Sequence, residues 1–254
     1  MSDWKDNQGT RPGFGTAPQA TGAVETRETV DEGLRKHMLG VYNYMASAVL
    51  LTGIVAWAVA ESGLVYSLVD PVNGPSLLYW AAVAVPFIMV MFLQFKIFSM
   101  SPLTAQIIYW TYATLIGVQI SFIFMAFTDI SIAQTFLATA VAFAGLSLWG
   151  YTTKKDLSGW GSFLVMGIWG GIAVSLLNVL FFGSGPFDMI MSLVFIGLFS
   201  AFVAYKTQET REIYLQLRGD AVMLQRATIY GALHLYMAFI SIFMNLLRFM
   251  GSNE

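Results

Sequence analysis

Seven long apolar runs, separated by short polar gaps, are the feature that most limits how this chain can fold. Each is close to the ~20 residues that a helix needs to cross the hydrocarbon core of a bilayer. Only helices and closed barrels can cross lipid, and the runs lack the period-two alternation of barrel strands. The sequence therefore predicts an all-α membrane protein with seven transmembrane helices. They cover about residues 38–60, 77–99, 103–127, 131–151, 161–183, 187–205 and 228–249.

The remaining sequence is too short for a second folded domain. Apolar residues make up 57% of the 254 residues and charged residues only 11%, whereas a soluble domain is about 25% charged. Residues 1–30 are polar, rich in Gly, Thr and Pro, and lack apolar periodicity, so we expect a disordered cytoplasmic tail there. Residues 31–254 then form a single seven-helix transmembrane domain.

The basic residues predict the orientation of these helices. With the N-terminus inside, all but one of the 13 Lys and Arg residues fall on the inner side, and only Arg248 falls outside. The outer gaps carry acidic residues instead, namely Glu61, Asp70, Asp129 and Asp188. Short cytoplasmic loops of membrane proteins are enriched in Lys and Arg. We therefore expect a cytoplasmic N-terminus.

Several classes of function lack any support in the sequence. There are no cysteines, and the motifs of metalloproteases, serine hydrolases and P-loop NTPases are missing. The net charge is −2, and the basic residues follow the topology rather than forming a nucleic-acid-binding stripe. We expect no enzymatic activity, no cofactor, no metal site and no nucleic-acid partner.

Polar side chains within the apolar runs are the candidates for a polar lining. The candidates are four amides and one imidazole: Gln94, Gln106, Asn178, Asn245 and His234. Hydrogen bonds between helices are the simpler explanation for such residues. Lys206 is a charge near the inner end of the sixth run, where a long stem lets an ammonium group reach water.

Two segments of the chain carry a specific likeness. They read MSPLTAQIIYWTYATLIGVQISFIFMAFTDISI at 100–132 and GYTTKKDLSGWGSFLVMGIWGGIAVSLLNVLFF at 150–182. Both resemble the Bax inhibitor-1 (TMBIM) family, in particular its bacterial YccA-like branch. The likeness continues at 205–215 and 233–251. It implies the family's bundle of seven helices with the N-terminus inside.

The resemblance also implies where the family's chemistry would lie. The family's pH-sensitive calcium leak is attributed to two aspartates in motifs close to YDxxQ and LYxDF. The matching residues here are Lys206 and Ala238, so both aspartates of the pH-sensing pair are replaced. Lys206 can pair with Glu209 one helical turn on. The resemblance therefore predicts the family scaffold without its two-carboxylate gate; the alternative is that Lys206 only reaches toward water and another acid gates the pore.

Two functions follow from this resemblance. The first is an accessory or interaction subunit of a membrane protein complex, by resemblance an FtsH-type protease assembly. The alternative is an ion leak channel, for calcium or protons, with altered selectivity or gating. We expect the lipid bilayer as the other partner. The tail lacks the features of a presequence and the likeness is to bacterial proteins, which favours a bacterial inner membrane over an organellar inner membrane.

Overall fold

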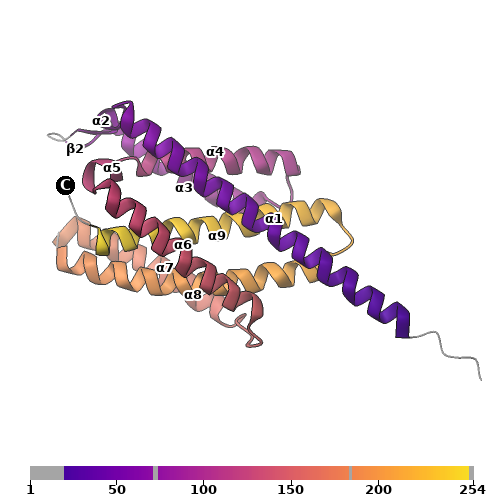
Figure 1. The fold of residues 1–254 in the computed structure, drawn as a ribbon. Helices are drawn as coiled ribbons and strands as arrows, with labels where there is room; N and C mark the ends of the chain where they lie inside the picture. The colour runs from indigo at the N-terminus through magenta and orange to yellow at the C-terminus, as the bar shows by residue number, and fades with distance from the viewer. Residues whose placement is uncertain (1–19, 71–73, 183–184, 252–254) are drawn as a thin grey trace, which may run out of the picture.

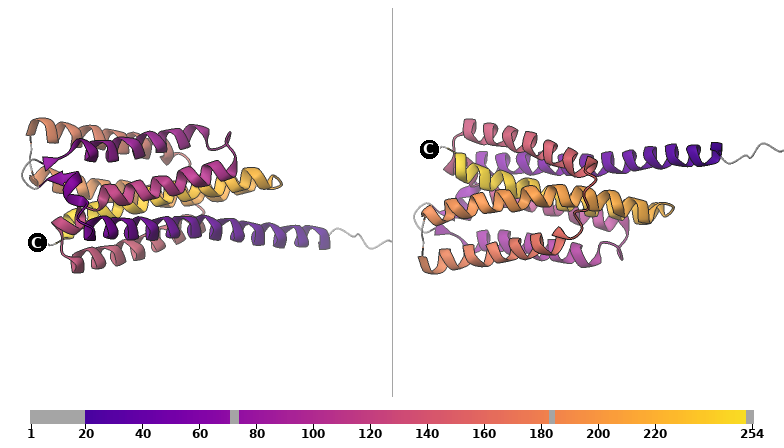
Figure 2. Two further views of the ribbon diagram at one scale, coloured as in Figure 1. Left: turned by 90° about the horizontal axis from the view of Figure 1, so that it is seen from above. Right: turned by 90° about the horizontal axis from the view of Figure 1, so that it is seen from below.

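The computed structural model describes residues 20–70, 74–182 and 185–251 (Figures 1 and 2). Seven helices of this described chain are long and apolar enough to cross a membrane, which confirms the predicted fold class. The elements are α1 (Ala20–Glu61), α2 (Val65–Leu68), β1 (Val69–Asp70), β2 (Gly74–Pro75), α3 (Leu77–Lys96), α4 (Pro102–Ile120), α5 (Ile123–Ala126), α6 (Asp129–Thr152), α7 (Trp160–Leu177), a π-helical turn (Asn178–Phe182), α8 (Gly185–Leu217) and α9 (Ala221–Met250). The two short strands pair antiparallel in the loop after α2.

The C-terminal helix α9 forms the core of the bundle. It packs against α1, α4, α6 and α8, and 67% of its span is buried. Only 11% of the α3 and α7 spans is buried; α3 packs mainly on α4, and α7 mainly on α8. Large apolar side chains such as Phe95 and Phe163 are exposed on these outer helices. Such surfaces suit helices that face lipid, because lipid tails are as apolar as the side chains.

Polar residues fix where several helices begin. Ser76, Ser101 and Thr128 each accept a hydrogen bond from the backbone N–H three residues further on. Asp220 accepts hydrogen bonds from two amides in the first turn of α9. The first amides of a helix have no partner within the helix, so these caps stabilise the starts of α3, α4, α6 and α9.

The first helix begins earlier than predicted. α1 begins at Ala20, within the segment 1–30 that the sequence predicts to be a tail, and residues 1–19 lie outside the described chain. The segment after Pro18 contains Ala, Glu and Arg, which favour helix, and no further proline before the apolar run. A search for apolar runs alone does not detect such a polar helical extension.

The sixth helix is longer than the apolar run that predicted it. α8 continues to Leu217, beyond the predicted end at residue 205. The extension has a buried face made of polar and amphipathic side chains, among them Lys206, Gln208 and Tyr214. Tertiary packing against α9 and α1, rather than continuous apolar sequence, holds this part of α8.

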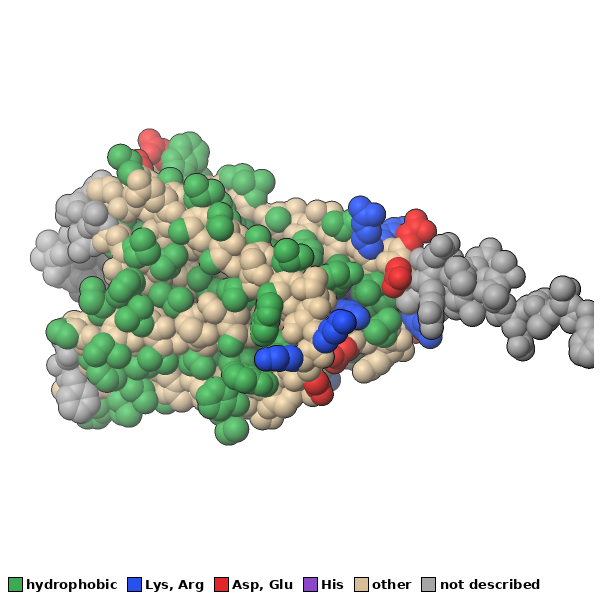
Figure 3. Space-filling view, turned by 60° about the horizontal axis from the view of Figure 1, so that its bottom comes forward, with side chains coloured by type: hydrophobic (Ala, Val, Ile, Leu, Met, Phe, Trp, Pro, Cys, Tyr) green, Lys and Arg blue, Asp and Glu red, His purple; other side chains and the backbone are tan. Residues whose placement is uncertain are grey.

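Basic side chains gather at one end of the bundle, shown in blue in Figure 3. We call this the basic end; it comprises the N-terminal half of α1, the end of α3, the α6–α7 loop, the end of α8 and the start of α9. The residues concerned are Arg35, Lys36, Lys96, Lys154, Lys155, Arg211, Arg218 and Arg226. The positive-inside rule predicts that the basic end faces the cytoplasm.

Candidate functional site

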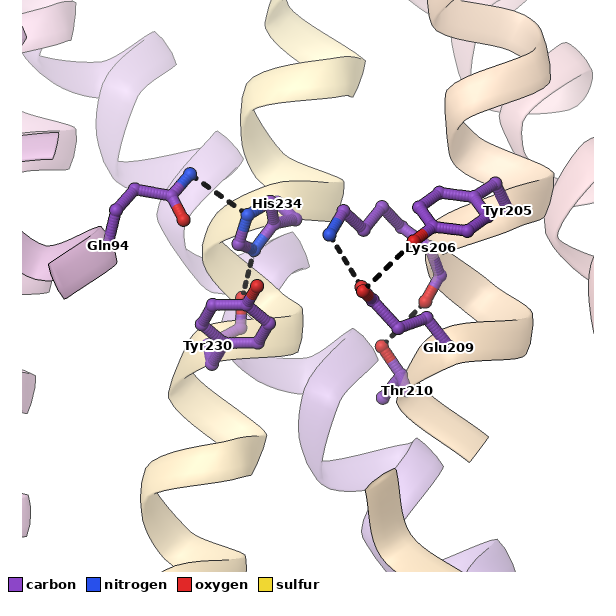
Figure 4. A network of polar contacts seen from close by, with 7 residues as sticks. All are labelled: Gln94, Tyr205, Lys206, Glu209, Thr210, Tyr230 and His234. Atoms are coloured by element: carbon purple, nitrogen blue, oxygen red, sulfur yellow. Dashed lines mark hydrogen bonds and ion pairs between the residues drawn. The ribbon is translucent and has the colours of Figure 1, made fainter. Parts of the chain in front are cut away.

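Lys206 is a buried cation in the half of α8 that leads to the basic end (Figure 4). Only 7% of the residue is exposed. Its Nζ donates to Glu209 Oε2 over 2.5 Å, and the two residues are one helical turn apart on the same face of α8. Among the residues that the structure describes, this is the one ion pair. The ammonium group is therefore held by the protein itself rather than by water.

Three aromatic rings surround the Lys206 ammonium group. Its Nζ lies 5.5 Å from the ring centroid of Phe202, 5.3 Å from that of Tyr205 and 5.5 Å from that of Tyr230. Phe202 and Tyr205 belong to α8, whereas Tyr230 belongs to α9. Cations within about 6 Å of an aromatic face are attracted by the ring quadrupole. We call Phe202, Tyr205, Tyr230 and Glu209 together the lysine cage.

The carboxylate of the cage is held from a second side. The Tyr205 hydroxyl donates to Glu209 Oε1 over 3.2 Å, so each carboxylate oxygen has a partner. Gly161 at the start of α7 makes room for this tyrosine, because a Cβ at that position would lie 2.6 Å from the Tyr205 hydroxyl oxygen. The Lys206 backbone carbonyl accepts a hydrogen bond from Thr210. The cage is thus fixed by α7, α8 and α9.

His234 lies on α9 beside the cage, as Figure 4 shows, and both of its ring nitrogens have partners. Nδ1 lies 2.8 Å from the Tyr230 carbonyl oxygen, which can only accept, so Nδ1 carries the proton. Nε2 lies 3.0 Å from Gln94 Nε2 and accepts from this amide on α3. The arrangement fits a neutral imidazole, and a protonated ring would require the Gln94 amide to turn over.

Ala238 follows His234 by one turn of α9 and is completely buried. Its side chain contributes a methyl group and no polar atom to the interface of α9 with its neighbours. The resemblance implies an aspartate at both positions in the family. In this chain, Lys206 is a cation in an ion pair, and Ala238 is apolar.

The other predicted lining residues do not join this network. Asn178 donates to Asp188 Oδ1 over 2.8 Å at the end of the bundle opposite the basic end. Asn245 donates to the Ser241 carbonyl on its own helix. Gln106 is half-buried on α4 and has no part in the contacts of the cage. Of the five predicted residues, the structure brings Gln94 and His234 together beside Lys206.

Gln208 is a structural residue that sequence reasoning missed. Its Oε1 accepts from the Leu157 backbone N–H over 2.7 Å, and its Nε2 donates to the Lys155 carbonyl over 2.9 Å. This amide therefore fastens the α6–α7 loop to α8, two residues after Lys206. The sequence signal was its place in the Tyr205–Gln208 motif, but its partners are backbone atoms about 50 residues away, which no local pattern reveals.

A second missed feature is a chain of hydroxyl groups that joins three helices. The Tyr42 hydroxyl on α1 lies 2.8 Å from Ser147 Oγ on α6, which lies 3.0 Å from Thr207 Oγ1 on α8. Ser147 and Thr207 are buried. Because each hydroxyl satisfies another, the chain ties α1, α6 and α8 together and leaves no unpaired oxygen.

Comparison with known proteins identifies the scaffold around this site. Residues 34–254 match the family model described as "Inhibitor of apoptosis-promoting Bax1". The chain belongs to the Bax inhibitor-1 family. It is 40% identical to an uncharacterized protein of Caulobacter vibrioides, over 89% of this chain and 92% of that protein. It is 34% identical to the inner membrane protein YbhL of Escherichia coli, over 93% of this chain and 98% of that protein.

A further relative agrees with this assignment. An uncharacterized protein of Rickettsia prowazekii is 37% identical over 89% of this chain and 94% of its own length. Membership of the Bax inhibitor-1 family confirms the resemblance drawn from residues 100–132 and 150–182. Its narrower part, the YccA-like branch, stays a prediction, as does the replacement of the family's two aspartates.

Proposed function

We propose that this chain is a non-conducting, non-enzymatic membrane subunit that acts by docking on another membrane protein complex. The observation that carries the proposal is the lysine cage, in which the Lys206 ammonium group is fixed beside Glu209. A conducting protein would instead bind and release a mobile cation there. The family resemblance puts one of the calcium-gating aspartates at position 206. A lysine there reverses the charge rather than merely removing it.

The contacts of the cage argue against calcium passage at this point. Calcium binds six to eight oxygen ligands, and the one carboxylate in the cage, Glu209, already pairs with Lys206 and Tyr205. A divalent cation that approached Glu209 would meet the repulsion of the ammonium group. These features support a closed interior.

The proposal also includes the membrane in which the chain lies and the complex on which it docks. YbhL of Escherichia coli is named as an inner membrane protein, which supports a bacterial inner membrane for this chain. The family resemblance suggests an FtsH-type protease assembly as the complex. A bundle with a closed interior still presents its basic end and its outer helices to such a partner.

Affinity purification tests the docking role. A tagged chain, expressed at native level in its own bacterial host, is extracted in mild detergent and weighed by light scattering and mass spectrometry. We expect a membrane partner in fixed stoichiometry, retained when Lys206 is replaced by Arg. Isolation of the chain alone, or of partners in amounts that scale with their abundance, would count against docking.

A proton leak is the second candidate, and one observation favours it. His234 is hydrogen-bonded to the Gln94 side chain and to the Tyr230 backbone carbonyl, and it lies beside the Lys206–Glu209 pair (Figure 4). A histidine inside a membrane bundle can carry protons when its ring titrates. A liposome assay with a pH-sensitive dye separates the two functions: the leak requires a proton flux that falls when His234 is replaced by Gln.

A further inference from the structure

An apolar groove runs between α1 and α6 toward the basic end. It encloses about 720 Å³, within the range of ~300–1,000 Å³ found for small-molecule sites. Its floor is recessed, with Met38 4% and Phe143 6% exposed. Its rim is open, with Leu39 51% and Leu148 65% exposed. The groove is therefore a furrow in the lipid-facing surface rather than a gap inside the core.

The groove runs from the head-group level into one leaflet of the bilayer. Along α1 it extends from Asp31 to Tyr42, which is about 16 Å at the rise of a helix. The hydrocarbon core of a bilayer is about 30 Å thick. Behind the groove, the hydroxyl chain from Tyr42 through Ser147 to Thr207 closes the way into the bundle. An acyl chain would therefore fit along the groove without entering the core.

A polar hollow continues the groove at the basic end. It encloses about 650 Å³ and shares Asp31 and Tyr151 with the groove. Charges of both signs surround the two openings. The basic side chains are Arg35, Lys154, Lys155 and Arg211, and the acidic ones are Asp31, Asp156 and Glu212.

No ion pair joins the basic and acidic side chains around these openings in the part of the chain that the structure describes, where the one ion pair found is Lys206–Glu209. Unpaired charges of both signs at the end of an apolar furrow are complementary to an amphiphile with a zwitterionic head. A phosphate group would lie against the basic side chains, and an ammonium group against Asp31 and Glu212.

We propose that the groove and the hollow together bind one zwitterionic phospholipid of the phosphatidylethanolamine type. One acyl chain lies between α1 and α6, and the phosphoethanolamine head lies in the hollow at the basic end. The proposal does not depend on whether the chain conducts ions or docks on a complex. It predicts a bound lipid that exchanges slowly and is selected by its head group, unlike the lipids that coat any membrane protein.

The unmodified protein gives the first test. The chain is reconstituted into bilayer discs with equal amounts of phosphatidylethanolamine and phosphatidylglycerol that share the same acyl chains. It is then extracted in mild detergent and weighed by native mass spectrometry. We expect one phosphatidylethanolamine per chain, preferred about fivefold or more, which equals about 1 kcal/mol. Retention in the proportions of the bilayer, or a preference for phosphatidylglycerol, would overturn the proposal.

A matched pair of variants tests the groove. Ala144 lines the groove and Ala142, also exposed on α6, does not. Ala144→Trp should fill the groove and reduce the retained lipid at least fivefold, whereas Ala142→Trp should retain it. Equal retention by two variants that elute and melt like the unmodified protein would refute the proposed acyl site.

Charge variants test the hollow without touching the core. Asp31→Asn with Glu212→Gln removes the expected ammonium contacts, and both residues are exposed. The head-group preference should then fall toward equality. Glu32→Gln, an exposed acid of α1 that lines neither opening, is the control and should keep the preference. A preference that survives the double change would show that the hollow does not hold the head group.

Discussion

Replacing Lys206 by Met removes the ammonium group and keeps an unbranched stem of similar length. The side chain of Lys206 is 9% exposed and that of Glu209 is 25% exposed. The variant would leave a largely enclosed carboxylate with the Tyr205 hydroxyl as its remaining partner. It also removes the cation from the three aromatic rings. The free energy of unfolding should therefore fall.

Two limits bracket the size of this fall. An exposed pair one turn apart contributes about 0.2–0.5 kcal/mol, and breaking a fully buried pair costs about 3–5 kcal/mol. Glu209 is partly exposed, which reduces the penalty, and the lost cation–π contacts add about 1 kcal/mol. We expect Lys206→Met to lower the free energy of unfolding by about 2–3 kcal/mol.

A double-mutant cycle isolates the pair from other effects of the substitution. Lys206→Met, Glu209→Gln and the double variant are unfolded in mixed detergent micelles and followed by circular dichroism. The coupling energy should be about 1–2 kcal/mol. Lys96→Met, at an exposed position near the basic end, is the control and should change stability by less than ~0.5 kcal/mol. If Lys206→Met costs no more than the control, Lys206 merely reaches toward water and the caged pair is not a structural element.

Two further predictions concern packing around the cage. Gly150→Ala should destabilise the protein by about 1–3 kcal/mol, because a Cβ there would lie 2.4 Å from the Ala204 carbonyl oxygen on α8. Gly145→Ala is the control and should not destabilise the protein, because open space surrounds this position. Equal thermal stability of the two variants would refute the close contact of α6 and α8. Gln208→Leu should leave the buried Leu157 backbone N–H without its acceptor, so the hydrogen-exchange rate of this amide should rise about tenfold or more. An unchanged exchange rate in a folded variant would show that the α6–α7 loop does not depend on Gln208.

The apolar runs allowed the architecture to be predicted because lipid permits few alternatives. Seven spans follow from length and hydropathy alone, and all are present in the described chain. The boundaries were less accurate where helix does not coincide with apolar sequence. α8 continues past residue 205 because it packs on α9, and α1 begins at Ala20 in a polar segment. Hydropathy does not report either effect.

The site could be predicted only where its contacts are local. The Lys206–Glu209 pair lies within one helical turn, so its spacing was readable. Tyr230 joins the cage from α9, and Gln94 reaches His234 from α3 across 140 residues of sequence. Such contacts depend on how the helices pack, which a single sequence does not specify. Asn178 and Asn245 look equally polar in the sequence, yet they form hydrogen bonds away from the cage.

The most direct test of the closed interior is calcium flux through the unmodified protein in liposomes loaded with a calcium dye. The account predicts no flux above that of protein-free liposomes at either acidic or neutral pH, while Lys206→Asp combined with Ala238→Asp produces a pH-dependent flux. A pH-dependent calcium leak through the unmodified chain would contradict the proposal that the Lys206–Glu209 pair closes this bundle.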